Sequence, residues 1–498
     1  MITIKNLCIA ILLLFALGLT SFAQKNINNP ILEQTEFNAK IDSIVEKYAN
    51  LLDIPRIAVG VVQNGKSIHV AGYGTANLDT KVPVTSRTLF KTSSVSKIFT
   101  AIAVMQLVER GFIKLEDKLI EHVKYFKTDD ENYKMVTVRH LLTHTSGVPR
   151  VYKRNYGFEN PEYDDDAIKR YVISLENKKF NFLPGEQQEY SNVGFVLLSA
   201  LVEEVKGIRF EDYISEYILK PAEMTESTSD YQNIDKSKLA AGHVIGNNFN
   251  NSVNSFFPDT RWITGADGLY STVEDMNKLA ITLMDDYKND SRKILRKETL
   301  EKMWTKDDDG LTLCWEIMDV WGGKLIGHRG NSPGFSTAFI FFDDIAITVF
   351  CNSNRSANMG ITSSIIKTIK NIEHAPPRLS GFDQIRSIMQ KNGFDAGIEE
   401  LKKLKKKEGE NFNTFGPLAF SLEVMQGNAE KRLLYAKEIL ETVVEDYPED
   451  VNVNDFIAEV YFRLALKHYG KTNNLDPNNW GLNKMYDQLS QVDLNFYK

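Results

Sequence analysis

Strand-like segments stand near both ends of a long stretch whose apolar spacing is helical. Residues 56–62 and 67–73 are apolar runs around a turn that contains Asn64-Gly65, a strong hairpin signal. From residue 311 to residue 351, short apolar runs are again separated by turns, as at Gly322-Gly323 and residues 331–334. We therefore predict an α+β fold: one antiparallel sheet, built from both ends of the domain, is flanked by helices and has an inserted helical subdomain.

The pattern divides the chain into three parts. Residues 1–23 have the layout of a signal peptide, with Lys5, an apolar core and a small-x-small site before Gln24. We expect export to the periplasm; a membrane anchor is the alternative, although the apolar run is short for a span. Residues 24–374 hold the strands and helices, and the sequence His374-Ala375-Pro376-Pro377 marks a linker.

Residues 375–498 are helical in pattern and rich in charge, an all-α extension. Ala436, Leu440 and Pro448 fall at the offsets of the second half of a tetratricopeptide repeat, and residues 457–461 match the first half of the next. The second repeat is short, so a tetratricopeptide-like pair and a plain helical extension both stay open. These helices are a candidate surface for a protein partner.

Charge and cysteine count exclude some classes of protein. The net charge of −7 argues against nucleic acid as a main partner. Export would leave two of the three cysteines, Cys314 and Cys351, both in strand-like runs where they act as small apolar residues. A disulfide scaffold is excluded by count.

Ser94 and Lys97 stand three residues apart at the start of a predicted amphipathic helix that runs to residue 109. This spacing places both side chains on one helix face. A serine hydroxyl becomes a useful nucleophile only when a neighbouring base takes its proton, and the helix start offers free N–H donors for an oxyanion. Ser364 and Lys367 repeat the spacing inside an apolar run, where a packing helix is the simpler explanation.

Tyr190-Ser191-Asn192 follows a turn and precedes an apolar helix. Phenol and amide groups at such a loop can converge on a pocket, where tyrosine can move protons and asparagine can donate to a carbonyl. His328-Arg329-Gly330 ends a strand-like run, and glycine there would let a substrate backbone approach the strand. Taken alone, His328 fits a hairpin with an exposed histidine.

His140 and His144 have the i, i+4 spacing of a zinc pair. No glutamate stands between them, so we favour a structural role and expect neither metal nor cofactor.

Five segments together resemble one family, in family order: FKTSSVSKIFT (residues 90–100), VRHLLTHTSGVP (138–149), LPGEQQEYSN (183–192), GADGLYSTVEDM (265–276) and GHRGNSPGF (327–335). They resemble the serine beta-lactamase-like family, which includes class C beta-lactamases, D-Ala-D-Ala carboxypeptidases, D-aminopeptidases and esterases; S-x-x-K is a signature of such enzymes. The resemblance covers about residues 35–372 and implies a beta-lactamase/transpeptidase-like fold.

The resemblance also implies roles. Ser94 would be the acylated nucleophile, Lys97 would assist its deprotonation, and Tyr190 would act as general base. Asn192 would position Lys97 and the substrate amide, and His328 would replace the lysine of the usual Lys-Thr-Gly triplet. Gly330 would line the cleft, and the backbone N–H groups of Ser94 and Asn331 would form the oxyanion hole.

Two departures from the family pattern bear on the substrate. Histidine at position 328 is usual in the peptidase and esterase branches, and Arg329 replaces a small hydroxyl residue that often contacts a substrate carboxylate. Asp267 stands where the family often has a small residue, and the sequence assigns it no role. We predict a serine hydrolase acting on an ester or amide, such as a D-amino-acid peptide, with weak beta-lactamase activity. The rival is a non-catalytic protein of the same fold that binds peptides or a protein partner.

Overall fold

The computed structural model describes most of the chain between residues 34 and 464. The described residues are 34–75, 81–149, 162–245, 251–253, 260–353, 355, 357–379, 381–409, 412, 430–448 and the single positions 417, 420, 421, 424, 453, 457, 460, 461 and 464. The predicted signal peptide lies outside them. No helix within these residues combines the length and the apolar character that crossing a bilayer requires.

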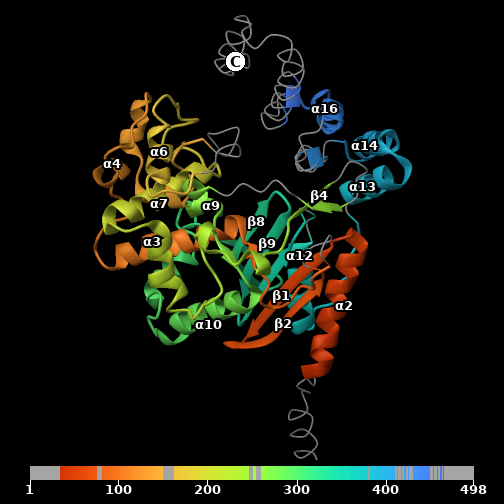
Figure 1. The fold of residues 1–498 in the computed structure, drawn as a ribbon, viewed down its shortest axis with the longest axis horizontal. Helices are drawn as coiled ribbons and strands as arrows, with labels where there is room; N and C mark the ends of the chain where they lie inside the picture. Colours follow the sequence, from red (N-terminus) through yellow and green to blue (C-terminus); the bar gives the residue numbers. More distant parts are fainter. Residues whose placement is uncertain are drawn as a thin grey trace, which may run out of the picture.

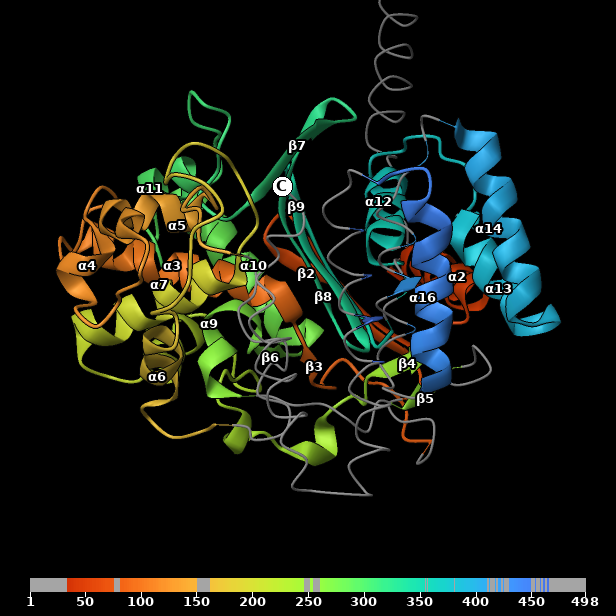
Figure 2. The same ribbon diagram turned by 90° about the horizontal axis from the view of Figure 1, so that it is seen from above.

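A six-stranded antiparallel sheet forms the centre of the protein (Figures 1 and 2). Its strand order is β2-β1-β10-β9-β8-β7, with β1 Arg56–Gln63, β2 Lys66–Gly74, β7 Glu316–Val320, β8 Gly323–Ser332, β9 Phe335–Phe342 and β10 Ile345–Cys351. Ile57 of β1 pairs with Cys351 of β10, so the first and last strands lie side by side. The predicted sheet built from both ends of the domain is confirmed.

Alternation along the strands gives the sheet two buried faces. Ile57 and Val59 face a core shared with α2 (Gln34–Leu52) and α12 (Asn358–Ile369), whereas Ala58 and Val62 face the larger core of the helical middle region. Figure 2 shows the sheet between these two helical layers. Two buried faces explain why β9 and β10 are buried along their whole length and mostly apolar.

The helical middle region lies between β2 and β7 in the chain. Its helices are α3 Ser96–Glu109, α4 Leu119–His122, α5 Val138–Leu142, α6 Ala167–Ile173, α7 Asn192–Lys206, α8 Phe210–Ile214, α9 Thr264–Asp267, α10 Val273–Asn289 and α11 Lys297–Met303. Two small sheets join its segments, β3 (Phe90–Lys91) with β6 (Tyr270–Ser271) and β4 (His243–Ile245) with β5 (Asn251–Val253).

Beyond the linker, α13 (Gly381–Asn392), α14 (Phe394–Glu408) and α16 (Glu430–Val444) share a hydrophobic cluster separate from the two cores of the sheet. Figures 1 and 2 place these helices on the α2 and α12 side of the sheet. A helical C-terminal region is therefore present. Whether it contains tetratricopeptide-like repeats stays a prediction.

The structure corrects three local predictions. Every residue of α3 from Ser96 to Leu107 is buried, so this helix is a core helix and not an amphipathic one. Strand β8 continues to Ser332 and pairs with β9 across a two-residue turn, which places Asn331 in the strand. Cys314 lies in a bend with a φ of 78° before β7, not in a strand, and both described cysteines are buried and free.

Candidate active site

Ser94 lies in a single 3-10 turn, η1 (Ser93–Val95), between β3 and α3. The turn begins with Ser93 in the left-handed region at a φ of 53°, a conformation that costs free energy in any residue but glycine. Thr92, just before it, is held from two sides: its N–H donates to the Leu269 carbonyl at 2.9 Å, and its carbonyl accepts from Thr337 Oγ1 at 2.7 Å. The nucleophile turn is thus fixed by its surroundings.

Lys97 places its amine beside the Ser94 hydroxyl. The side chain is fully buried, and Nζ donates to Ser94 Oγ at 3.2 Å and to the Ala266 carbonyl of α9 at 2.7 Å. Nζ also lies 4.9 Å from the centre of the Tyr190 ring and 5.6 Å from that of Phe195. The predicted serine–lysine pair is therefore in direct contact, with the lysine fully buried and the serine partly exposed.

Tyr190 and Asn192 flank the N-cap of α7. Ser191 caps the helix by accepting from the Gly194 N–H at 3.1 Å, and its own hydroxyl donates to the Pro149 carbonyl at 2.9 Å. This cap fixes the entry of the chain into α7, where the Tyr190 ring lies beside Lys97. The Oδ1 atom of Asn192 is buried and has no hydrogen-bond partner among the described residues, as suits an acceptor kept for a ligand or for a moving lysine.

The His144 ring packs against the Tyr190 ring. The ring centres lie 4.5 Å apart, and the Ser191 N–H donates to His144 Nδ1 at 3.1 Å. Nδ1 therefore accepts, which requires that it carry no proton. The sequence argument missed this role because it weighed His144 only against His140. His140 instead forms a capping box with Thr137, and no cluster of metal-binding side chains occurs in the described part of the chain.

His328 approaches from β8 and is neutral. Its ring centre lies 6.3 Å from that of Tyr190. Burial lowers the pKa of His328 to about 4; nearby Glu316 opposes this shift and Lys97 adds to it. Nδ1 lies 2.6 Å from the Arg329 carbonyl, which can only accept, so Nδ1 carries the proton. Nε2 of His328 therefore offers a lone pair, where a lysine would offer a charge.

Gly330 lets β8 pass directly against the nucleophile turn. A Cβ atom at this position would lie 2.5 Å from the Thr92 carbonyl oxygen, 2.8 Å from Ser93 Cβ and 2.3 Å from Thr337 Oγ1. No side chain fits there without moving backbone. Because side chains alternate along a strand, His328, Gly330 and Ser332 share the face that meets Ser94.

Arg329 and Asn331 lie on the opposite face of β8. Both are exposed, and Arg329 Nε donates to Glu316 Oε2 on β7 at 2.7 Å. The pairing of β7 with β8 stops at Gly327, so beyond it the outer edge of β8 has no strand partner within the described residues. The Asn331 backbone belongs to this open segment. Contacts thus link Ser94, Lys97, Tyr190 and His328, and Gly330 lies against the turn that carries Ser94. Asn192 follows Tyr190 at the start of α7, and the Asn331 side chain lies on the opposite face of β8.

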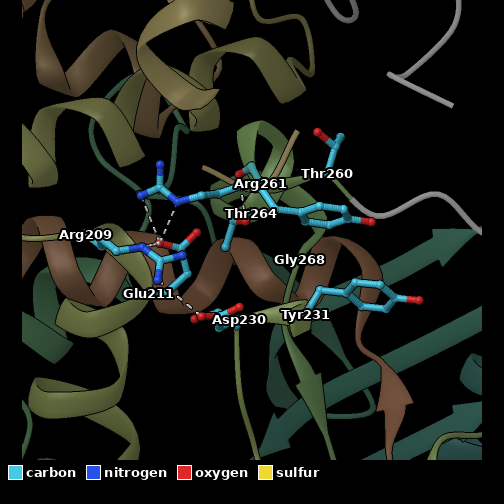
Figure 3. A pocket seen from close by; sticks show the side chains of 10 residues that line it. Arg209, Glu211, Asp230, Tyr231, Thr260, Arg261, Thr264 and Gly268 are labelled. Atoms are coloured by element: carbon cyan, nitrogen blue, oxygen red, sulfur yellow. Dashed lines mark hydrogen bonds and ion pairs between the residues drawn. The ribbon is translucent and has the colours of Figure 1, made fainter. Parts of the chain in front are cut away.

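The pocket shown in Figure 3 is separate from the site around Ser94. It has a volume of about 290 Å³ including its open mouth, and it is lined by Arg209, Glu211, Arg261, Thr264, Gly268 and neighbouring residues, not by Ser94 or Lys97. Thr264 and Gly268 are four residues apart on one side of α9, whereas Ala266, which accepts from Lys97, lies on the other. A buried ion pair of Arg261 with Glu211, 3.0 Å long, anchors this rear side of α9.

Comparisons with known proteins agree on one family. A family model described as Beta-lactamase matches residues 41–364. Penicillin-binding protein 4* of Bacillus subtilis (strain 168) is 27% identical over 338 residues, which cover 63% of this chain and 71% of that protein. Protein flp of Staphylococcus aureus (strain MRSA252) is 32% identical over 200 residues, 40% of this chain and 39% of its own length. The match thus spans less than half of Protein flp.

Solved structures give the same result. An octameric penicillin-binding protein homologue from Pyrococcus abyssi superposes with a TM-score of 0.60 and 26% identity, covering 71% of this chain and 81% of that chain. A penicillin binding protein from Bacillus halodurans gives a TM-score of 0.55 and 25% identity, covering 67% of this chain and 99% of that chain.

Proposed function

The chain belongs to the Beta-lactamase family, whose members are generally serine hydrolases, and from this premise we propose that it hydrolyses an ester or amide through an acyl-enzyme on Ser94. The contact that carries the proposal is the 3.2 Å hydrogen bond from the buried Lys97 amine to the Ser94 hydroxyl. This contact places the nucleophile within hydrogen-bond reach of the amine through which its proton would pass to Tyr190.

Acylation uses the groups gathered on the front of α3. Ser94 Oγ attacks the acyl carbon and loses its proton through Lys97 to Tyr190, whose ring lies over the same amine. The oxygen of the tetrahedral intermediate accepts from the backbone N–H groups of Ser94 and Asn331. The bond to the leaving group then breaks, and the departing alcohol or amine takes the proton from Tyr190.

Deacylation reverses these roles with water as the nucleophile. Water gives a proton to Tyr190 and attacks the acyl carbon, the bond between that carbon and Ser94 Oγ breaks, and Oγ regains a proton. Neutral His328, whose ring centre lies 6.3 Å from that of Tyr190, offers the site a hydrogen-bond acceptor at Nε2.

The substrate we propose is a neutral ester or a D-amino-acid peptide without a carboxylate next to β8. Strand β8 brings no positive charge to the face that meets Ser94, because His328 is neutral and Arg329 lies on the other face beside Glu316. A carboxylate taken out of water there would lack the cationic partner that Lys-Thr-Gly enzymes supply. Carboxylate-bearing beta-lactams are then poor substrates. The open edge of β8 suits an extended acyl chain.

Turnover of a p-nitrophenyl ester tests the proposal. Ser94→Ala should abolish turnover above the uncatalysed rate. The chain supplies a matched control: Ser364 has the same spacing to Lys367 but is buried in α12 against Tyr48, so Ser364→Ala should keep full activity. Absence of turnover in the wild-type protein, with esters, D-amino amides and cephalosporins all tried, would support the rival binding protein.

Export, periplasmic location and a partner-binding tail complete the proposal. The segment of residues 1–23 supports export through its charge and apolar pattern. The cluster formed by α13, α14 and α16 supports a tail that carries repeats and holds a partner. Equal ester turnover by the full chain and by a chain ending at Glu373 would show that the tail is not needed for chemistry.

A further inference from the structure

Asp267, for which the sequence offered no role, sits at the junction of three segments. Its carboxylate accepts from Ser332 Oγ, at 2.8 Å to Oδ1 and 3.0 Å to Oδ2, and Lys91 Nζ lies 3.4 Å from Oδ2. The Lys91 side chain is 4% exposed and that of Asp267 20%, so the ion pair is largely shielded from water. Shielded pairs of this kind hold their geometry more firmly than surface pairs.

Each of the three segments carries one part of the proposed reaction. Lys91 stands three residues before Ser94, on the strand that leads into the nucleophile turn. Asp267 follows Ala266, whose carbonyl accepts from Lys97. Ser332 stands two residues after Gly330, on the open-edged part of β8. The carboxylate therefore links the nucleophile, the lysine and the substrate strand.

The segment that carries Asp267 needs such a link. Helix α9 is a single turn of four residues, too short to keep its place by its own hydrogen bonds. The turn just before it in the chain begins at Arg261, which is held by its buried ion pair with Glu211. On the front side the Leu269 N–H donates to Ser96 Oγ at 3.0 Å, which ties the segment to α3, and Asp267 adds the tie to β8.

We infer that Asp267 is a positioning residue that sets the spacing between Ser94, the acceptor of Lys97 and the edge of β8. This inference rests on the proposed function, because the spacing matters for acylation at Ser94. Errors of about 1 Å in the placement of reacting groups can cost about a hundredfold in rate. Removing the carboxylate takes away the two contacts with Ser332 and leaves the charge of Lys91 buried without this partner, so the ties between the three segments weaken.

The test is the maximal rate of acylation by a fluorophosphonate, measured at saturating probe together with the thermal unfolding midpoint. Asp267→Ala should lower the maximal rate about tenfold or more while the probe concentration at half-maximal rate changes little. Asp267→Asn, which keeps an acceptor for Ser332 but loses the charge, should fall between Asp267→Ala and the wild type. Ser332→Ala removes one tie without leaving a buried charge and should also slow acylation.

Asp286→Asn is the matched control for a purely structural loss. The Asp286 carboxylate is buried and accepts from the backbone N–H groups of Lys293, Ile294 and Leu295, in a loop that contributes nothing to the site. This variant should unfold at a lower temperature yet be acylated at the wild-type rate below that temperature.

The double variant separates positioning from independent effects. Because Ser332 acts through Asp267, the variant Asp267→Ala/Ser332→Ala should be acylated no more slowly than Asp267→Ala. The inference is overturned if the reductions in acylation rate of the two single variants multiply in the double variant, or if Asp267→Ala is acylated at the wild-type rate. An unlabelled wild-type protein is a distinct result: it overturns the proposed function and, with it, the reaction that Asp267 would support.

Discussion

Gly330→Ala should slow ester hydrolysis about a hundredfold, because the new methyl group has no room between β8 and the nucleophile turn. It would lie 2.5 Å from the Thr92 carbonyl oxygen and 2.8 Å from Ser93 Cβ, where ordinary contact begins at 3.4 Å. The two segments must therefore separate by somewhat less than about 1 Å. A shift of that size can cost about a hundredfold in rate, close to 2.7 kcal/mol of barrier.

The same crowding should lower stability by about 1–3 kcal/mol, the usual range for an overpacked site. Thr337→Ala in the Gly330→Ala background removes the closest side-chain atom, but it leaves the Thr92 carbonyl in place and removes the hydroxyl that holds it, so it should restore little of the activity. The assay is kcat/KM for a p-nitrophenyl ester, with urea unfolding of the same preparations.

Gly323→Ala is the control at the far end of the same strand. There a new Cβ would lie 2.6 Å from Cζ of the Phe342 ring, so stability should fall while kcat/KM stays at the wild-type value. If Gly330→Ala is as active and as stable as the wild-type protein, β8 does not press on the nucleophile turn and this description of the site is wrong.

Three further changes have expected outcomes. The pKa of His328 is lower in the folded than in the unfolded protein, so protonation of this ring favours the unfolded state. As pH falls from about 6.5 to 4, the free energy of unfolding should therefore decrease by about 3 kcal/mol. His328→Gln should remove this part of the pH dependence in urea unfolding. Ser93→Gly relieves a left-handed φ and breaks no hydrogen bond in the described residues, so the unfolding free energy should rise by about 0.5–1 kcal/mol; a fall would show that the turn is not strained. Arg261→Ala removes the nearest cation of Glu203 and Glu211 and leaves only Arg209, 3.8 Å from Glu211, so it should destabilise the fold by about 3 kcal/mol in calorimetry, an expectation refuted by an unchanged midpoint.

The sheet could be predicted because its signals are local. The turn at Asn64-Gly65 and the apolar alternation around it define a hairpin, and the runs before Cys351 define the strands that meet it. The spacing of Ser94 and Lys97 allowed their contact but did not decide it, because Ser364 and Lys367 have the same spacing, yet Ser364 meets Tyr48 and Lys367 lies over Trp321.

Contacts between distant segments could not be read in this way. Asp267 meets Ser332 across 65 residues, and only the folded chain shows that Ala266 turns its carbonyl to Lys97 while Thr264 faces the rear pocket. The left-handed φ of Ser93 has no sequence signal, because serine ordinarily avoids it and tertiary packing imposes it. The place of Arg329 on the outer face followed from strand alternation, but only once β8 was known to run through to Ser332.

The most direct test of the central claim is mass-spectrometric mapping of a fluorophosphonate adduct on the full chain. A single adduct should appear on Ser94 in the wild-type protein, persist in Ser364→Ala and disappear in Ser94→Ala. Adduct on another serine, or labelling that survives Ser94→Ala, would contradict the assignment of Ser94 as the nucleophile activated by Lys97.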